Sequence, residues 1–128
     1  MLLPERNIYL FKIVNVAMEP TTTGGKRYRI FARAVEWPEE YEPAIDGIAL
    51  DGRGKWPSIT KLRGLGYAGK IEDLKTEDLM GKMFYARVDR SGRWAKYSHF
   101  THAEYGAHMG YWTLADRPEG VAVPPSAV

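Results

Sequence analysis

The 128-residue sequence contains no cysteine, which excludes disulfide bonds, zinc–thiolate sites and a cysteine nucleophile. It also lacks an apolar run of the length needed to span a membrane. Its first ten residues, MLLPERNIYL, show no basic region followed by a long apolar stretch, so we expect no signal peptide. Together these absences predict a cytoplasmic protein without a membrane partner, because a chain without cysteine fits a reducing compartment.

Catalytic motifs are missing as well. The sequence has no nucleophile elbow, no HExxH metal motif and no phosphate-binding loop with its lysine and serine. Acidic pairs such as Glu39/Glu40 and Asp73/Glu77 fall in loops or on helix surfaces, where solvated charges explain them. We therefore predict a protein that is not an enzyme and that needs no cofactor, since an enzyme would require a pocket with converging titratable groups.

Two motifs suggest ligands but have simpler explanations. GLGYAG at residues 64–69 matches the dinucleotide-binding fingerprint, but a predicted helix rather than a strand precedes it. This order favours a helix end followed by a turn. His99 and His102 face opposite sides of a predicted strand, so they would bind one metal ion together only if the strand ended between them. We therefore predict no metal site.

The formal net charge is only +2, but the charge is unevenly distributed. Residues 1–50 contain six Lys/Arg and seven Asp/Glu, residues 51–102 contain eleven and six, and residues 103–128 contain one and three. The central excess favours an anionic partner, against the alternative of an ordinary solvated surface. Within this region the GRGK motif brings Arg53 and Lys55 into consideration as phosphate ligands, although a plain turn is the simpler interpretation.

Alternating hydrophobicity predicts strands and hairpins along most of the chain. The first strand is apolar on both faces, which is typical of a central or strongly coiled strand. A loop with proline and paired glycines then leads into a second, very basic strand. The predicted elements are strands at 7–18 and 26–37, an acidic, proline-containing loop at 38–47, a short strand ending in a glycine-rich turn within 48–55, a helix at 56–66, helical turns at 70–82 and a hairpin at 83–102.

This order of elements predicts an all-β fold. It corresponds to an OB-fold-like β-barrel of five main strands with a short helix between strands 3 and 4. A small antiparallel β-sandwich is the structural alternative. We place one barrel domain at residues 1–115, and we predict that the proline-rich residues 116–128 form a flexible C-terminal tail.

The basic strand, KRYRIFARAVEW at residues 26–37, raises the main functional question. A period of two directs one set of its side chains to the core and the other to solvent. Neighbouring outward side chains lie about 6.5–7 Å apart, which suits the nucleotide repeat of a single strand, and an aromatic ring among cations suits base stacking. The strand is thus either a basic ribbon for an anionic partner or a half-buried strand with an ordinary solvated face. The expected core set is Tyr28, Ile30, Ala32 and Ala34, and the outward set is Arg27, Arg29, Phe31, Arg33 and Val35.

The second half of the chain carries a further pattern, from LRGLGYAGKIEDLKTEDLMGKMFYARV to the later YSHF. It resembles the small phage-type single-stranded-DNA-binding proteins, which show a Leu-x-x-Leu-Gly segment and then an Asp-Leu-x-Gly-Lys turn before a strand. The resemblance covers roughly residues 8–102, and it implies an OB fold and a role in DNA replication or recombination in the host-cell cytoplasm. The matching residues are Leu62, Leu65 and Gly66, then Asp78, Leu79, Gly81 and Lys82, then Phe84 to Val88.

One feature departs from this family pattern. Bacterial-type members often end in an acidic tail with an apolar tip that recruits partners, whereas EGVAVPPSAV is apolar and hardly acidic. The resemblance therefore gives little support for recruitment of replication or recombination proteins through this tail. It leaves open a homo-oligomer and such partners at other surfaces.

The leading interpretation is a sequence-tolerant protein that binds single-stranded nucleic acid, with DNA as the first choice and RNA left open as the alternative partner. Cations would track the phosphates and aromatic rings would stack on bases. The candidate nucleic-acid-binding residues are Arg27, Arg29, Phe31, Arg33, Arg53, Lys55, Trp56, Tyr85, Arg87, Trp94 and Lys96.

A different class of function stays open from the sequence. The chain is alternatively a small β-barrel adaptor or inhibitor that binds a host protein through the aromatic residues Tyr105, Tyr111 and Trp112. Salt dependence separates the two classes, because nucleic-acid affinity falls steeply with salt and the affinity of an apolar protein interface does not.

Overall fold

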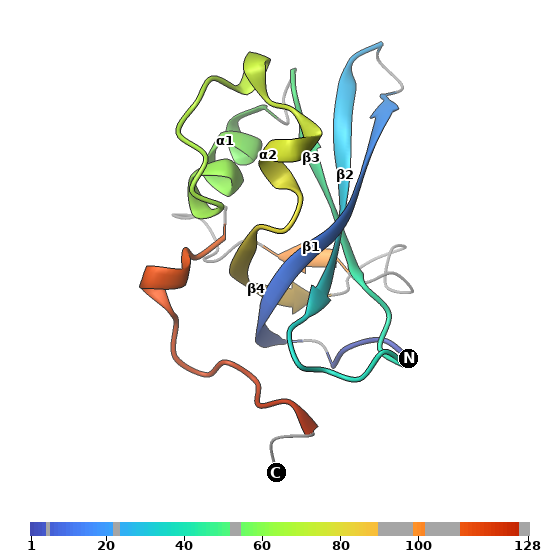
Figure 1. Ribbon diagram of the computed structural model, residues 1–128, viewed down its shortest axis with the longest axis vertical. Helices are drawn as coiled ribbons and strands as arrows, with labels where there is room; N and C mark the ends of the chain where they lie inside the picture. Colours follow the sequence, from blue (N-terminus) through green and yellow to red (C-terminus); the bar gives the residue numbers. More distant parts are fainter. Residues whose placement is uncertain (5, 22–23, 52–54, 90–98, 102–110, 126–128) are drawn as a thin grey trace.

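The computed structural model describes residues 1–4, 6–21, 24–51, 55–89, 99–101 and 111–125. Most of the regular structure is β, and two short α-helices and a 3₁₀ helix (Ile71–Asp73) lie between the third and fourth strands (Figure 1). The strands are β1 (Asn7–Pro20), β2 (Lys26–Ala34), β3 (Ala44–Ala49), β4 (Met83–Asp89) and β5 (His99–Thr101), and the helices are α1 (Lys55–Gly64) and α2 (Thr76–Leu79).

The strands form a closed barrel in the order β1-β2-β3-β5-β4. Four of them make a curved antiparallel sheet in which β1 pairs with both β2 and β4. The three-residue β5 joins the two ends of this sheet, because it pairs with β3 in parallel and with β4 antiparallel. The predicted barrel-like, mostly-β architecture is therefore confirmed, although only four of the strands are long.

Strand β1 has apolar side chains on both sides because the set of positions that points into the core changes part of the way along the strand. Tyr9, Phe11 and Ile13 point into the core and are at most 1% exposed. A register shift between Ile13 and Asn15 then inserts one residue, as a β-bulge does. Beyond the shift the even-numbered Val16 packs against the core. The first half of this 14-residue strand pairs with β4 and its second half pairs with β2. Strand β1 thus lies between two other strands, which agrees with the prediction of a central or strongly coiled strand.

Strand β2 has the predicted alternation. Its four expected core residues are buried, and Ile30 and Ala32 are completely inaccessible. Its other side chains are exposed or partly exposed. The hairpin that leads into it closes with a hydrogen bond from the Thr21 N–H to the Gly25 carbonyl, at 2.9 Å. The sequence pattern therefore predicts correctly which side of β2 faces solvent.

The GLGYAG motif ends helix α1 instead of opening a nucleotide-binding helix. Gly66 has φ 82°, a left-handed conformation that glycine adopts without strain. The Tyr67 N–H donates to the Leu62 carbonyl at 2.9 Å, and the Gly66 N–H donates to the Arg63 carbonyl at 3.0 Å. This pair of bonds forms a Schellman motif, which satisfies the last carbonyls of a helix. The interpretation of the motif as a helix end and turn is confirmed.

One boundary prediction from the sequence is wrong. The acidic, proline-containing residues 38–47 were expected to form a loop throughout, but β3 begins at Ala44. The side chains of Ala44 and Ile48 are both fully buried in the core, so burial on one face outweighs the loop-like composition.

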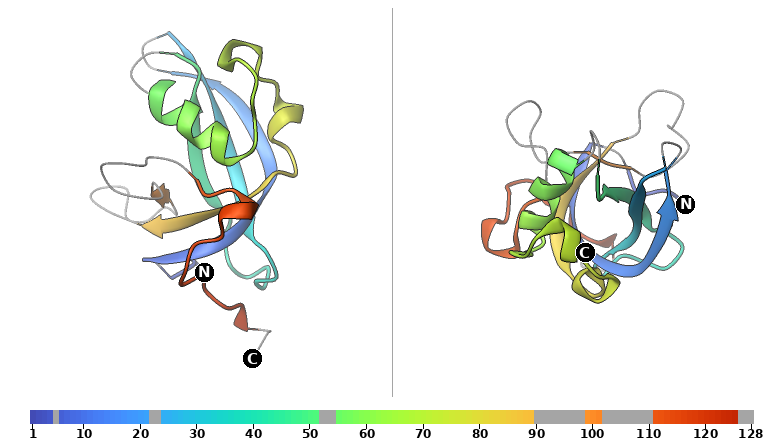
Figure 2. Two further views of the ribbon diagram at one scale, coloured as in Figure 1. Left: turned by 90° about the vertical axis from the view of Figure 1, so that its left-hand side faces the viewer. Right: turned by 90° about the horizontal axis from the view of Figure 1, so that it is seen from above.

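The C-terminal segment returns to the barrel (Figures 1 and 2). Tyr85 of β4 and Trp112 exchange two backbone hydrogen bonds of 3.0 Å, so the segment that contains Trp112 pairs with β4 at this point. Further on, the Ala122 N–H donates to the Ile8 carbonyl at 2.7 Å. The chain beyond residue 115 thus contacts β1 in this structure, and the mobility predicted for residues 116–128 would require this contact to break.

No helix in the part of the chain that the structure describes is long and apolar enough to cross a membrane.

Candidate nucleic-acid interface

The outward side of β2 lies between outward residues of β1 and β3. Residues opposite each other in an antiparallel pair have neighbouring side chains on the same side of the sheet. We call this surface, formed by β2 and its neighbours from Asn15 to Glu19 and from Ile45 to Ala49, the β2 face. Across it, Arg27 lies opposite Glu19 and Ala49, Arg29 opposite Ala17 and Gly47, and Phe31 opposite Asn15 and Ile45.

Small residues flank the two arginines. Ala17, Gly47 and Ala49 have small side chains or none, so these three neighbours do not cover the guanidinium groups. Arg27 extends over β3, since a Cβ built on Gly47 would lie 3.9 Å from its Cδ. The side chains of Arg27 and Arg29 keep 42% and 40% of their surface exposed. A ligand on the β2 face therefore reaches both cations directly.

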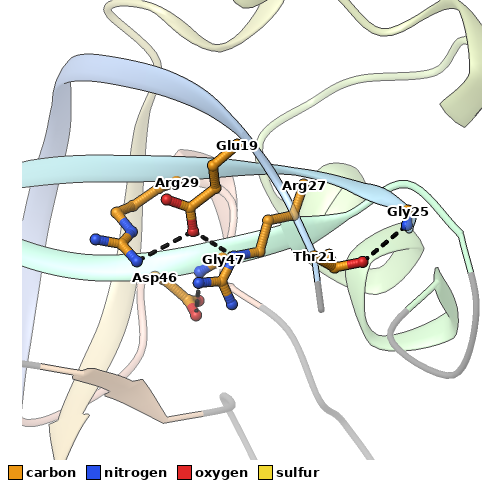
Figure 3. A network of polar contacts seen from close by, with 7 residues as sticks. All are labelled: Glu19, Thr21, Gly25, Arg27, Arg29, Asp46 and Gly47. Atoms are coloured by element: carbon orange, nitrogen blue, oxygen red, sulfur yellow. Dashed lines mark hydrogen bonds and ion pairs between the residues drawn. The ribbon is translucent and has the colours of Figure 1, made fainter. Parts of the chain in front are cut away.

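Glu19 holds both arginines on this face. Its Oε1 atom accepts a hydrogen bond from Arg27 Nε and lies 3.0 Å from Arg29 Nη2 (Figure 3). Partial burial alone would raise the pKa of Glu19, but the hydrogen bonds and charges of Arg27 and Arg29 outweigh that effect and lower it. Glu19 is consequently ionised at neutral pH, and the three side chains together carry a net charge of +1.

Phe31 continues the same row of outward side chains. It is partly exposed, whereas Phe11 and Phe84 are fully buried in the barrel. The side chains of β2 therefore alternate as the sequence predicts, with cations and one accessible aromatic ring on the solvent side. This combination suits a polyanion whose bases are available for stacking.

Arg33 extends the cationic row toward the far end of β2. Its side chain is exposed, and its Nη1 donates to the Tyr41 carbonyl at 3.0 Å. The exposed Lys12 of β1 lies directly opposite. Sequence reasoning missed Lys12, because its relation to Arg33 depends on the register of the hairpin. The available signal was a single lysine among apolar residues on the even-numbered side of the first strand.

The candidates near helix α1 are only partly described. Lys55 begins the helix, and its Nζ forms a 3.0 Å ion pair with Glu72 at the protein surface. Arg53, Trp94 and Lys96 lie outside the described residues, as does the side chain of Trp56. Their assignment to the binding surface stays a prediction.

Tyr85 and Arg87 are not part of the β2 face. They lie opposite Leu10 and Ile8 in the first half of β1, whereas Glu19 is near its other end. The Tyr85 side chain is covered, since the residue is only 6% exposed and the Arg117 guanidinium lies 5.6 Å from its ring centre. In this structure the Tyr85 ring has no open face for a base.

The residues of the alternative protein-binding surface are also partly placed. Tyr111 is buried, and its hydroxyl donates to Asp46 Oδ2, so it does not form an exposed docking site. Trp112 is partly exposed beside β4. Tyr105 lies outside the description, and so do His102, Glu104 and His108 of the histidine-rich stretch.

Within the described ranges, no three His, Cys, Asp or Glu residues gather in a group that could hold a metal ion. No protein-family model matches the chain, and no curated protein is significantly similar to it. The function is therefore inferred from the chemistry and geometry of the β2 face.

Proposed function

We propose that the protein binds single-stranded nucleic acid, in the first instance DNA, with little sequence preference and without catalysis. The observation that carries this proposal is the row Arg27, Arg29 and Phe31 on the solvent side of β2, in which small residues of β1 and β3 flank the two arginines. The strand order and the helices between β3 and β4 support it, because the OB fold has this connectivity and commonly binds oligonucleotides across strands 2 and 3. The resemblance to phage-type single-stranded-DNA-binding proteins suggests a role in replication or recombination.

In the proposed mechanism, the arginines bind phosphates by charge and an aromatic ring stacks on a base. Alternate residues on a strand are about 6.5–7 Å apart, so Arg27 and Arg29 suit two successive phosphates of an extended strand. Phe31, two residues further along, offers its ring to an unpaired base, and stacking of this kind tolerates any base. Arg33 and Lys12 extend the cationic path in the direction of β4.

We expect Arg27→Ala/Arg29→Ala to weaken binding to all oligonucleotides alike. The slope of log affinity against log salt should fall by about 1.4, or about 0.7 for each lost contact with a single-strand phosphate. The fold should survive, because both side chains are substantially exposed. Fluorescence anisotropy of labelled oligonucleotides at several salt concentrations measures both the affinity and the slope.

The matched control for this experiment is Arg63→Ala/Lys70→Ala. Both residues are exposed, and they lie in the helical region between β3 and β4. The control removes the same charge, so it separates a local binding site from a general effect of net charge. Equal loss of affinity in the two double variants would reject the β2 face as the binding site.

Phe31→Ala tests the stacking half of the mechanism. We expect it to reduce the affinity for single strands by about 1–3 kcal/mol if the ring stacks on one base. The salt slope should be unchanged, because no phosphate contact is removed. The two measurements are the binding isotherm and its salt dependence, and unchanged affinity would exclude Phe31 from the interface.

A further inference from the structure

Glu19 is an unusual residue to find on a surface proposed to bind a polyanion. It projects from β1 directly opposite Arg27, and its Oε1 also contacts Arg29 (Figure 3). We infer that Glu19 determines selectivity by making binding depend on base stacking as well as on charge, so that single strands are preferred to duplexes. This inference rests on the proposed function and adds a residue that discriminates between two forms of the ligand.

The carboxylate competes with phosphates without closing the site. Arg27 Nε and Arg29 Nη2 both point to the same carboxylate oxygen, so an incoming phosphate must share these donors or displace Glu19 from them. Displacement costs little, because the two arginines are about two-fifths exposed and ion pairs between exposed side chains contribute little free energy. Glu19 therefore reduces the gain from phosphate contacts alone.

Phe31 lies where it can contact a base of the strand that binds the arginines. It follows Arg29 on the same side of β2, so a strand whose phosphates approach the arginines can bring a base to the ring. A single strand offers that base and recovers free energy by stacking. A duplex keeps its bases paired inside, presents more phosphate charge along its length, and meets the Glu19 carboxylate without the compensating contact.

Glu19 exerts this effect throughout the neutral pH range. The lowered pKa described above keeps the carboxylate ionised. The charged groups that face Glu19 on the β2 face are Arg27 and Arg29. The preference for single strands over duplexes therefore requires no change in the protonation state of Glu19.

Glu19→Gln tests the inference, with affinities for a labelled oligonucleotide and for the matching duplex measured at the same salt concentration. We expect single-strand affinity to rise about two- to fivefold, as removal of one exposed charge allows. Duplex affinity should rise more, so that the ratio of single-strand to duplex affinity falls at least about twofold. The salt slope for both ligands should become steeper.

Two variants serve as controls. Glu39→Gln removes an equal charge from an exposed position between β2 and β3, and it should leave the affinity ratio unchanged. Glu19→Asp keeps the negative charge beside the arginines, and its ratio should stay close to that of the original protein. Glu19→Asp also tests the inference if Glu19→Gln fails to fold. If its ratio of single-strand to duplex affinity were as low as that expected for loss of the charge, the inference would be rejected.

The remaining outcomes separate this inference from the function on which it rests. If the original protein binds no oligonucleotide, both are overturned. If it binds, and Arg27→Ala/Arg29→Ala weakens binding, but Glu19→Gln gives the same ratio as Glu39→Gln, then only the role of Glu19 is rejected. Weaker single-strand binding by Glu19→Gln also rejects it, because Glu19 would then simply hold the arginines in place.

Discussion

Lys61→Met should lower the free energy of unfolding by about 3–5 kcal/mol, because it leaves a buried carboxylate without its cation. Lys61 Nζ lies 2.8 Å from Asp46 Oδ2, and the two side chains are only 10% and 14% exposed. Nζ also donates to the Gly47 carbonyl at 3.1 Å, and the Tyr111 hydroxyl donates to the same Asp46 oxygen. Methionine has a similar length but offers no charge or donor to this group.

This buried network connects three separate parts of the chain. Asp46 belongs to β3, Lys61 to α1, and Tyr111 to the segment that returns along the barrel. Burial, reinforced by the Asp46 carboxylate, raises the pKa of Tyr111 well above its ordinary value, so its hydroxyl stays protonated and donates at neutral pH. The packing beside it is tight, since a Cβ on Gly64 would lie 2.3 Å from the Tyr111 carbonyl oxygen.

Urea denaturation measures the effect, and Lys55→Met is the matched control. The Lys55–Glu72 pair has a similar length of 3.0 Å, but its side chains are 38% and 62% exposed, so the control should leave the free energy of unfolding nearly unchanged. Replacing both buried partners, as in Lys61→Met/Asp46→Leu, should cost less than Lys61→Met alone, since no charge is left unpaired. Equal, small losses for Lys61→Met and Lys55→Met would show that the buried pair does not hold the fold together.

The sequence pattern correctly predicted those features that depend on residues close together in the chain. The alternation in β2 follows from the period of two in a strand, and the end of α1 follows from Gly66 and its left-handed conformation. Both could be inferred from residues close together in the sequence. The outward row Arg27, Arg29 and Phe31 could be predicted for the same reason.

The remaining features depend on pairs of residues that local patterns do not specify. Glu19 meets Arg27 because of the hairpin register, and Lys12 meets Arg33 because a bulge after Ile13 shifts that register by one residue. The cover on Tyr85 comes from Arg117, 32 residues further along the chain. A single sequence shows that a residue such as Lys12 is polar, but it does not show which residue it pairs with, so these pairs were missed.

Phe84 provides the last test, because it has the same chemistry as Phe31 but the opposite environment. It is fully buried, stacks on Tyr111 with a centroid distance of 4.2 Å, and lies 5.8 Å from the ring of Phe11. Phe84→Ala should therefore lower the free energy of unfolding by about 3–5 kcal/mol, as expected for a cavity in a packed core. Urea denaturation followed by circular dichroism measures this loss.

The comparison of Phe84→Ala with Phe31→Ala separates the core of the barrel from its proposed binding surface. Phe31 is partly exposed on β2, so its removal should cost little stability while affecting affinity. Phe84 faces inward on β4, so its removal should leave the affinity per folded molecule unchanged. If Phe31→Ala instead lost as much stability as Phe84→Ala, the Phe31 ring would belong to the core. The β2 face would then keep its cations but lose the aromatic contact that distinguishes an unpaired strand from a duplex.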